Sequence, residues 1–480
     1  MNGTDTAAAA EAVLSPAAGG AGAPVALTAH PLQRVGAFAL AALAGADSPE
    51  AMTSEEFKTA TAGMADDVAA TADVEDAKSA GGFWLGVSYL MWPNSAMNLT
   101  ARKKLAKPEL RSRIRSWRTY PDTRLGVPCA LCGRAACGFF GKVDVPLGAS
   151  TEHRNTTAPG HGGLALCPGC LASFHALPYG CRIGGGRASV LHSWDDAFLR
   201  GTVRTQVSRT RRRLEISSGP AGSGPYAPEV AALRRLRSYE ERLRAGVELY
   251  VFSNSNREQS LDVHALEEPL AEWLRTSMLG GRAGEGFRYL VRAHWTEKIP
   301  GSALLARHAF RQPGRILGRA TGYLGGLALE SGAPPAETAA LAGVCLSFAT
   351  EVLQVQERDA ERIRELAGRI AGLIAAQPER GGLKRYEAAQ RAPRELQAYL
   401  KREAVAWVLG PGQAQPLVTD EQWRLLFDPD GQGWLHRDLL LISVLQGLAE
   451  RGWKPGTGPA DDPAARAGRD DTLLTDQEDQ

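Results

Sequence analysis

Residues 129–132 read Cys-Ala-Leu-Cys and residues 167–170 read Cys-Pro-Gly-Cys, with 34 residues between the two motifs. Two residues between paired cysteines let both sulfurs turn toward one ion, and two such pairs supply the four thiolates of a tetrahedral zinc site. The segment around them is rich in Gly and Pro. We therefore predict a structural Zn²⁺ ion, against the alternative of four unligated buried cysteines, at Cys129, Cys132, Cys167 and Cys170.

Further candidate ligands lie close to these motifs in the sequence. Cys137 and Cys181 lack a second cysteine at the same spacing, and His153, His161 and His175 lie between or just after the pairs. Their spacing does not decide whether any of them joins the metal site. Four thiolates saturate a zinc ion and leave no position for water, so the pattern predicts a non-catalytic site.

One alternative is an enzyme. Glu152 and His153, placed between two cysteine pairs, resemble zinc-stapled HNH nucleases, in which a histidine activates water against a phosphodiester. The match is incomplete, because no Asn stands just before Cys167 and Leu171 follows the second pair. We expect a protein that is not an enzyme and keep an HNH-like DNA nuclease as the second reading.

The composition is that of an ordinary soluble protein. The chain has 480 residues, 44% hydrophobic and 22% charged, with a formal net charge of +2. The longest apolar stretch, residues 35–46, is too short to cross a bilayer of about 30 Å as a helix. The first residues lack the pattern of an export signal. We expect a cytoplasmic protein without membrane contact, where cysteines stay reduced and available to metal.

The hydrophobic pattern predicts an α+β fold, with a mixed N-terminal domain, an inserted zinc module and a C-terminal helical bundle. We expect helices at residues 35–43, 230–245, 341–374, 396–408 and 438–448, and a capping box at Thr53 and Glu56. We expect strands at 82–90, 248–253 and 261–264. The predicted parts are a disordered N-terminus (1–27), an N-terminal α+β region (28–126), a zinc-binding cysteine module (127–216), a linker, helix and strand region (217–303), a helical bundle (304–455) and an acidic disordered tail (456–480).

Basic residues are unevenly distributed in this nearly neutral chain. One run contains Lys103, Lys104, Arg111, Arg113, Arg115 and Arg118, and a second contains Arg209, Arg211, Arg212 and Arg213. Two such runs beside a zinc module indicate binding to a phosphate backbone, although a charge run is also typical of a solvated surface. Three loop asparagines can hydrogen-bond base edges or simply form turns: Asn94, Asn254 and Asn256.

In their order along the chain, several stretches resemble the large subunit of type I CRISPR Cascade surveillance complexes, of the I-B-like kind with a CXXC-CXXC signature. The resemblance covers about residues 28–455. It rests on the two cysteine pairs, on the helical end of the chain, and on residues 30–36, 52–57, 93–94, 164–166 and 249–254. The basic stretch at residues 209–224 matches no motif of that family.

The resemblance implies a binding role in antiviral defence. The guide RNA reads the target by base pairing, and the protein reads a short motif, the PAM, in the flanking duplex. The expected partners are double-stranded target DNA with its PAM, the crRNA-containing Cascade subunits (backbone, crRNA-processing and small subunits) and the helicase-nuclease that cuts.

A third possible function is that of a zinc-dependent scaffold that contacts only protein. We also expect the segment from 304 to 455 to fold alone, and hypothesise that an internal start produces it as a separate small subunit.

Overall fold

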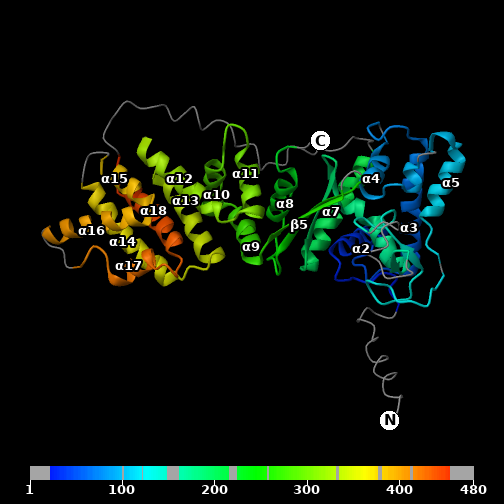
Figure 1. Ribbon diagram of the computed structural model, residues 1–480, viewed down its shortest axis with the longest axis horizontal. Coiled ribbons are helices and arrows are strands. Elements are labelled where there is room, and N and C mark those ends of the chain that lie inside the picture. The colour runs from blue at the N-terminus through cyan, green and yellow to red at the C-terminus, as the bar shows by residue number, and fades with distance from the viewer. Residues whose placement is uncertain are drawn as a thin grey trace, which may run out of the picture. The chain divides into compact units, whose positions relative to one another are not determined.

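The computed structural model describes residues 22–454, except for 80, 100–101, 122, 149–161, 216–223, 257–258, 331–334, 377–380 and 411–414. The described chain combines helices and sheet and is mostly helical (Figure 1). It forms two compact units, which we call the first unit (Met1–Gly224 with Val247–Ala265) and the second unit (Pro225–Gly246 with Leu266–Gln480). Residues 1–21 of the predicted disordered N-terminus, residues 217–223 of the predicted linker region and the acidic tail lie outside the described residues. The predicted disorder also covers residues 22–27, but these are described, and Val25 is fully buried in the core of the first unit.

Helix α2 (Pro31–Ala44) lies at the centre of the first unit. It packs against α3 (Ser54–Ala69), α6 (Pro168–Ala176) and α7 (Asp196–Glu215). Gly36 allows the contact with α6, because a Cβ on this residue would lie 1.9 Å from the carbonyl oxygen of Ser173. The predicted helix at 35–43 is confirmed, and Thr53 and Glu56 form the predicted capping box at the start of α3.

The main sheet of the first unit has four strands in the order β3-β4-β5-β6. The strands are β3 (Arg182–Gly184), β4 (Arg187–Ser193), β5 (Val247–Asn254) and β6 (Gln259–Leu266). Strand β4 is antiparallel to β3 and to β5, with Val190 opposite Tyr250. The predicted strands at 248–253 and 261–264 are therefore present, and they lie in the same unit as the cysteine motifs.

The stretch at 82–90, predicted as a strand, is a helix, α4 (Phe83–Met91). Its aromatic and β-branched composition favours a strand. The buried residues Trp84, Val87, Ser88 and Met91 recur at steps of three and four, the period of a helix packed on one side. Tertiary packing overrides the local preference here.

The second unit is helical among its described residues. Its helices are α8 (Ala227–Arg237), α9 (Glu268–Ser277), α10 (Gly281–Ala293), α11 (Gly301–Arg311), α12 (Arg315–Glu330), α13 (Pro335–Ser347), α14 (Glu357–Ala375), α15 (Gly381–Gln390), α16 (Pro393–Leu409), α17 (Asp420–Phe427) and α18 (Gly433–Glu450). Helix α18 contacts α12, α13, α14 and α17 and forms much of the core. The domain boundary predicted between 303 and 304 falls inside α11.

Two helix predictions in this unit are wrong in extent. The single helix expected over 341–374 is α13 and α14, separated by a π-helical turn (Phe348–Val352) and by Gln354, which has a positive φ of 56°. The apolar stripe continues across the break because both helices face the same core. The charged helix expected over 230–245 ends at Arg237.

The cysteine module is part of the first unit's core rather than a separate insert, because Cys129, Cys167 and Cys170 belong to the same buried cluster as α2. No helix in the described part of the chain is long and apolar enough to cross a membrane.

Candidate functional site

The first cysteine pair lies in a tight turn. The backbone N–H of Gly133 donates to the carbonyl of Cys129 at 2.9 Å, and Gly133 has a positive φ of 74°, which glycine adopts without strain. An antiparallel bridge between Pro128 and Ala135 closes the turn. This geometry directs Cys129 and Cys132 to the same side.

The second pair lies in the first turn of α6. Strands β1 (Gly138–Phe140) and β2 (Leu164–Leu166) form an antiparallel hairpin, and β2 leads directly into Cys167. Cys167 is the N-cap of α6, and its sulfur accepts the backbone N–H of Cys170 at 3.5 Å. The N–H of Ala130 donates to the carbonyl of Ala165 at 2.8 Å, which ties the first turn to the hairpin.

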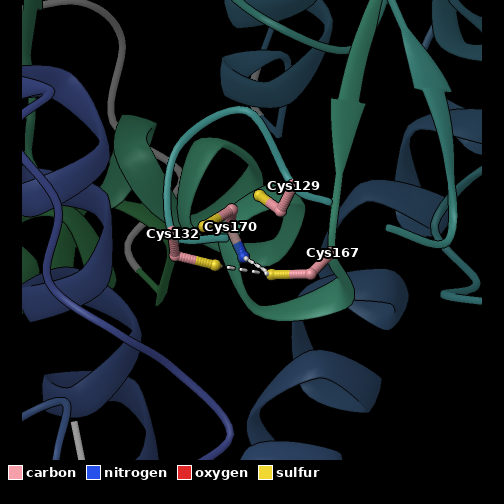
Figure 2. Close-up of side chains that lie close together, drawn as sticks. All are labelled: Cys129, Cys132, Cys167 and Cys170. Carbon is pink, nitrogen blue, oxygen red and sulfur yellow. Dashed lines mark hydrogen bonds between the residues drawn. The ribbon is translucent and has the colours of Figure 1, made fainter. Parts of the chain in front are cut away.

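The four sulfurs converge on one point (Figure 2). All four Sγ atoms of Cys129, Cys132, Cys167 and Cys170 lie within 4.8 Å of one another, and the Sγ atoms of Cys132 and Cys167 are 3.5 Å apart. Zinc–sulfur bonds of about 2.3 Å in a tetrahedron place sulfurs about 3.8 Å apart. The cluster can therefore hold a metal ion, and its dimensions fit zinc.

The electrostatics of the cluster also fit a cation. Hydrogen bonds from Cys132, Cys167 and Cys170 lower the pKa of the Cys129 thiol, whereas contacts with the other three raise the pKa of Cys170. Four thiolates at this separation repel one another strongly, so the sulfurs can ionise together only around a divalent ion. The N-terminus of α6 adds partial positive charge at Cys167 and Cys170.

The other candidate ligands do not join the group where the structure describes them. His175 is buried in α6, and its Nδ1 hydrogen-bonds to the hydroxyl of Tyr120 at 2.9 Å. Cys137 and Cys181 are buried outside the four-sulfur group. His153 and His161 lie outside the described residues. The structure therefore offers no geometric support for an HNH-like nuclease site.

The first basic run is only partly available to a ligand. Arg111 forms an ion pair with Asp73, and Arg115 with Asp66. In contrast, Lys103, Lys104 and Arg113 are exposed and have no ion pair with any described residue. The last three are the better candidates for phosphate contacts from this run.

Arg118, the last residue of the first run, lies in the core and not on the surface, so it is not a candidate for phosphate contact. Its guanidinium lies over the rings of Trp92 and Trp117 at 4.0 and 4.1 Å, and burial lowers its pKa to about 10. Trp117 donates its Nε1–H to Asp144 at 2.8 Å and is partly buried.

The second basic run occupies the last two turns of α7. Arg209, Arg211 and Arg212 are exposed, and Arg213 is partly buried. Burial raises the pKa of Asp67, which the nearby positive charge of Arg211 partly offsets. Asp66 pairs with Arg115 of helix α5 (Lys107–Trp117), and Asp67 lies near Arg211, so the acidic pair at the end of α3 lies between the two basic runs.

The three predicted asparagines gather in one place, with different roles. Asn254 is fully buried; its Nδ2 donates to the carbonyls of Met91 and Lys142, at 2.6 and 3.0 Å, and its Oδ1 accepts from Gln259. This amide holds three segments together and is fully buried, out of reach of a base, so we do not keep it among the candidate DNA contacts.

The other two asparagines lie at the surface above it. Asn256 donates its Nδ2–H to the Oδ1 of Asn94 at 3.0 Å, and both side chains are exposed. Lys142 lies next to this pair, with its ammonium 3.4 Å from the carbonyl oxygen of Ser255. The sequence offered no signal for Lys142, because a single lysine in a Gly-rich loop is unremarkable without the fold.

No family model matches this chain, and neither a curated protein nor a solved structure matches it.

Proposed function

We propose that this chain is the zinc-stapled DNA-recognition subunit of a type I CRISPR surveillance complex, a protein that reads the PAM in the duplex beside the guide-paired strand. The observation that carries the proposal is the exposed Asn94–Asn256 pair, assembled from two distant loops in the unit that bears the cysteine cluster. The helicase-nuclease and the crRNA-bearing subunits are its proposed partners.

The amide pair has the hydrogen-bonding pattern needed to read a base. Once Asn256 donates to Asn94, the Nδ2 of Asn94 is left as a donor and the Oδ1 of Asn256 as an acceptor. Reversing both amides leaves the same combination, one donor and one acceptor, so the pattern does not depend on their orientation. Adenine presents the complementary pair, N7 and N6–H, in the major groove. We therefore propose that the pair prefers adenine at the base it contacts.

Exposed cations supply the positioning contacts in this account. Lys103, Lys104 and Arg113 have no carboxylate partner among the described residues, which leaves them available to phosphates. The second run, Arg209 to Arg213, is a second proposed phosphate surface. Contacts of this kind set register and affinity but carry no base information.

The metal has a structural role in the proposal. A zinc ion held by four cysteines has no open coordination position, and its contribution is to fix the hairpin against the first turn of α6. Accordingly, purified protein incubated with supercoiled plasmid and Mg²⁺ or Mn²⁺ should leave the plasmid intact. Cleavage that disappears in His153→Ala would support the HNH-like nuclease instead.

The assembly itself is testable by affinity purification. The tagged chain, isolated from cells that carry its neighbouring genes, should bring down a guide RNA of uniform repeat-derived ends together with a backbone subunit. A Cys170→Ser variant should recover less of both, because the zinc-bearing unit is destabilised. Recovery of the chain without RNA, under conditions where the backbone subunit and guide RNA copurify with each other, would contradict the proposal.

A further inference from the structure

Helix α16 is buried along its first half only. Leu396, Tyr399 and Leu400 are buried, in agreement with the apolar stripe predicted from the sequence. Toward its end, apolar side chains also occupy the side that faces solvent: Val408 and Leu409 are 74% and 82% exposed. With Val405 at 63%, these are the three most exposed large apolar side chains in the described part of the chain.

These side chains continue a basic face on the same helix. Spacings of three, four and seven residues place Arg394, Lys401, Val405 and Val408 along one side of α16, and all four are exposed. The face is therefore cationic toward the start of the helix and apolar toward its end. An occupant that matches it must carry carboxylates beside a short apolar segment.

The end of this chain has that composition. Residues 455–480 contain seven carboxylates and two arginines, and Leu473-Leu474 is flanked by Asp470-Asp471 on one side and by Asp476, Glu478 and Asp479 on the other. We propose that this segment binds the exposed face of α16, with the two leucines on Val405, Val408 and Leu409 and the flanking carboxylates on Arg394 and Lys401.

The connection is long enough for this contact. Fifteen residues lie between Lys454, the last described residue, and Asp470, and an extended chain of that length spans about 50 Å. Helix α15 contacts both α18, which precedes the segment, and α16. Neighbouring helix axes lie about 10 Å apart, so α16 is within reach. The proposal is independent of the DNA-binding role, but any anionic partner of this face would have to displace the segment.

The experiment uses a labelled synthetic peptide of residues 461–480 and the chain ending at Lys454, with binding followed by fluorescence anisotropy. The peptide should bind this shortened chain and should bind the full-length chain about tenfold more weakly, because the full-length chain already carries the segment. Val405→Gln with Val408→Gln, which removes the apolar contact without adding charge at exposed positions, should abolish binding. Leu279→Gln, at another exposed apolar position of the same unit, is the matched control and should bind normally.

A second peptide with Leu473→Ser and Leu474→Ser should fail to bind, which separates the apolar contact from general charge attraction. Absence of peptide binding to the shortened chain, or equal binding by the Val405→Gln/Val408→Gln variant, would overturn the proposal. Sedimentation gives an independent measurement, the oligomeric state of the shortened chain. If the face instead pairs with a second copy, the shortened chain will dimerise through it and the double variant will be monomeric, an outcome that also overturns the proposal.

Discussion

Asn256 donates a hydrogen bond of 3.0 Å to the side-chain oxygen of Asn94, although 162 positions separate the two residues in the sequence. The contact joins the turn after β5 to the loop after α4, where Asn94 has a positive φ of 66°. Beneath it, Asn254 bonds to Met91 and Lys142 and holds the two loops in place. A buried amide thus supports an exposed pair that is free to contact a ligand.

This division of roles predicts opposite effects for neighbouring asparagines. Asn256→Ala should leave the melting temperature unchanged but reduce discrimination at one base of the flanking duplex, by about 1–3 kcal/mol for a lost bidentate contact. Asn254→Ala should instead destabilise the first unit by about 1–3 kcal/mol, because buried carbonyls lose their donor. Selection from a randomised duplex library and thermal melting measure the two effects. Unaltered base preference in Asn256→Ala and Asn94→Ala would contradict a reading role.

The cysteine cluster makes a prediction with an internal control. Cys170→Ser should remove the zinc and destabilise the first unit, since structural zinc sites contribute on the order of 10 kcal/mol to folding. Cys137→Ser changes another buried cysteine of the same segment and should retain one zinc per chain. Metal analysis of the purified proteins by mass spectrometry distinguishes them. Wild-type protein without zinc would refute the assignment of the ion.

Local sequence was sufficient to predict features that depend only on interactions between neighbouring residues. The capping box at Thr53 and Glu56 needs only a hydroxyl and a carboxylate three residues apart, and it forms as predicted. The two cysteine pairs follow the same logic, because the turn before Gly133 and the first turn of α6 each present two sulfurs to one side. The antiparallel pairing of β1 with β2 then brings the two cysteine pairs together.

Prediction failed where distant segments decide the outcome. The aromatic composition of α4 predicts a strand. The helical spacing of its buried residues becomes clear only once its packing in the core is known. Arg111 and Arg115 read as free cations, yet Asp73 and Asp66 neutralise them from segments 38 and 49 positions away. Pairing between Asn94 and Asn256 likewise follows from the tertiary fold, which the sequence pattern does not reveal.

The helical end makes a prediction about where a fragment can begin. In α10, a Cβ on Gly286 would lie 2.4 Å from the carbonyl oxygen of Ala340, so this helix packs tightly on α13. A fragment of residues 304–455, the one expected from sequence, lacks α10 and cuts α11, and it exposes that face of α13. We expect it to lack a cooperative melt, whereas residues 225–246 joined to 266–454, which keep α8 against α9 and α11, should melt cooperatively by circular dichroism. Cooperative melting of the shorter fragment would restore the sequence-based boundary.

Acid sensitivity of the second unit should trace in part to a buried histidine. Burial lowers the pKa of His294 from 6.5 to about 4, and its Nδ1 bonds to the carbonyl of Leu290 at 2.8 Å. Because the unfolded chain binds the proton more readily, the stability is complete above pH 6.5 and falls as the pH drops toward 4. The loss from this group is at most about 3 kcal/mol.

His294→Asn keeps a donor toward Leu290 and cannot take up a proton in this range. Urea unfolding at pH 7 and pH 4.5 should therefore show a smaller pH-dependent loss for the variant than for wild type, even if the variant is less stable at both. Equal losses in the two proteins would remove His294 from the acid response.

Recognition of a duplex by the Asn94–Asn256 pair requires that the first unit bind duplex DNA through its exposed cations, and the salt dependence of binding by the purified chain tests this most directly. Each lost phosphate contact should flatten the log–log salt slope by about 0.9, so Lys103→Ala, Lys104→Ala and Arg113→Ala together should reduce it by about 2.7. Arg111→Ala with Arg115→Ala, whose charges already pair with Asp73 and Asp66, should change the slope much less. A wild-type chain that does not bind duplex, or a triple variant with the wild-type slope, would contradict the account.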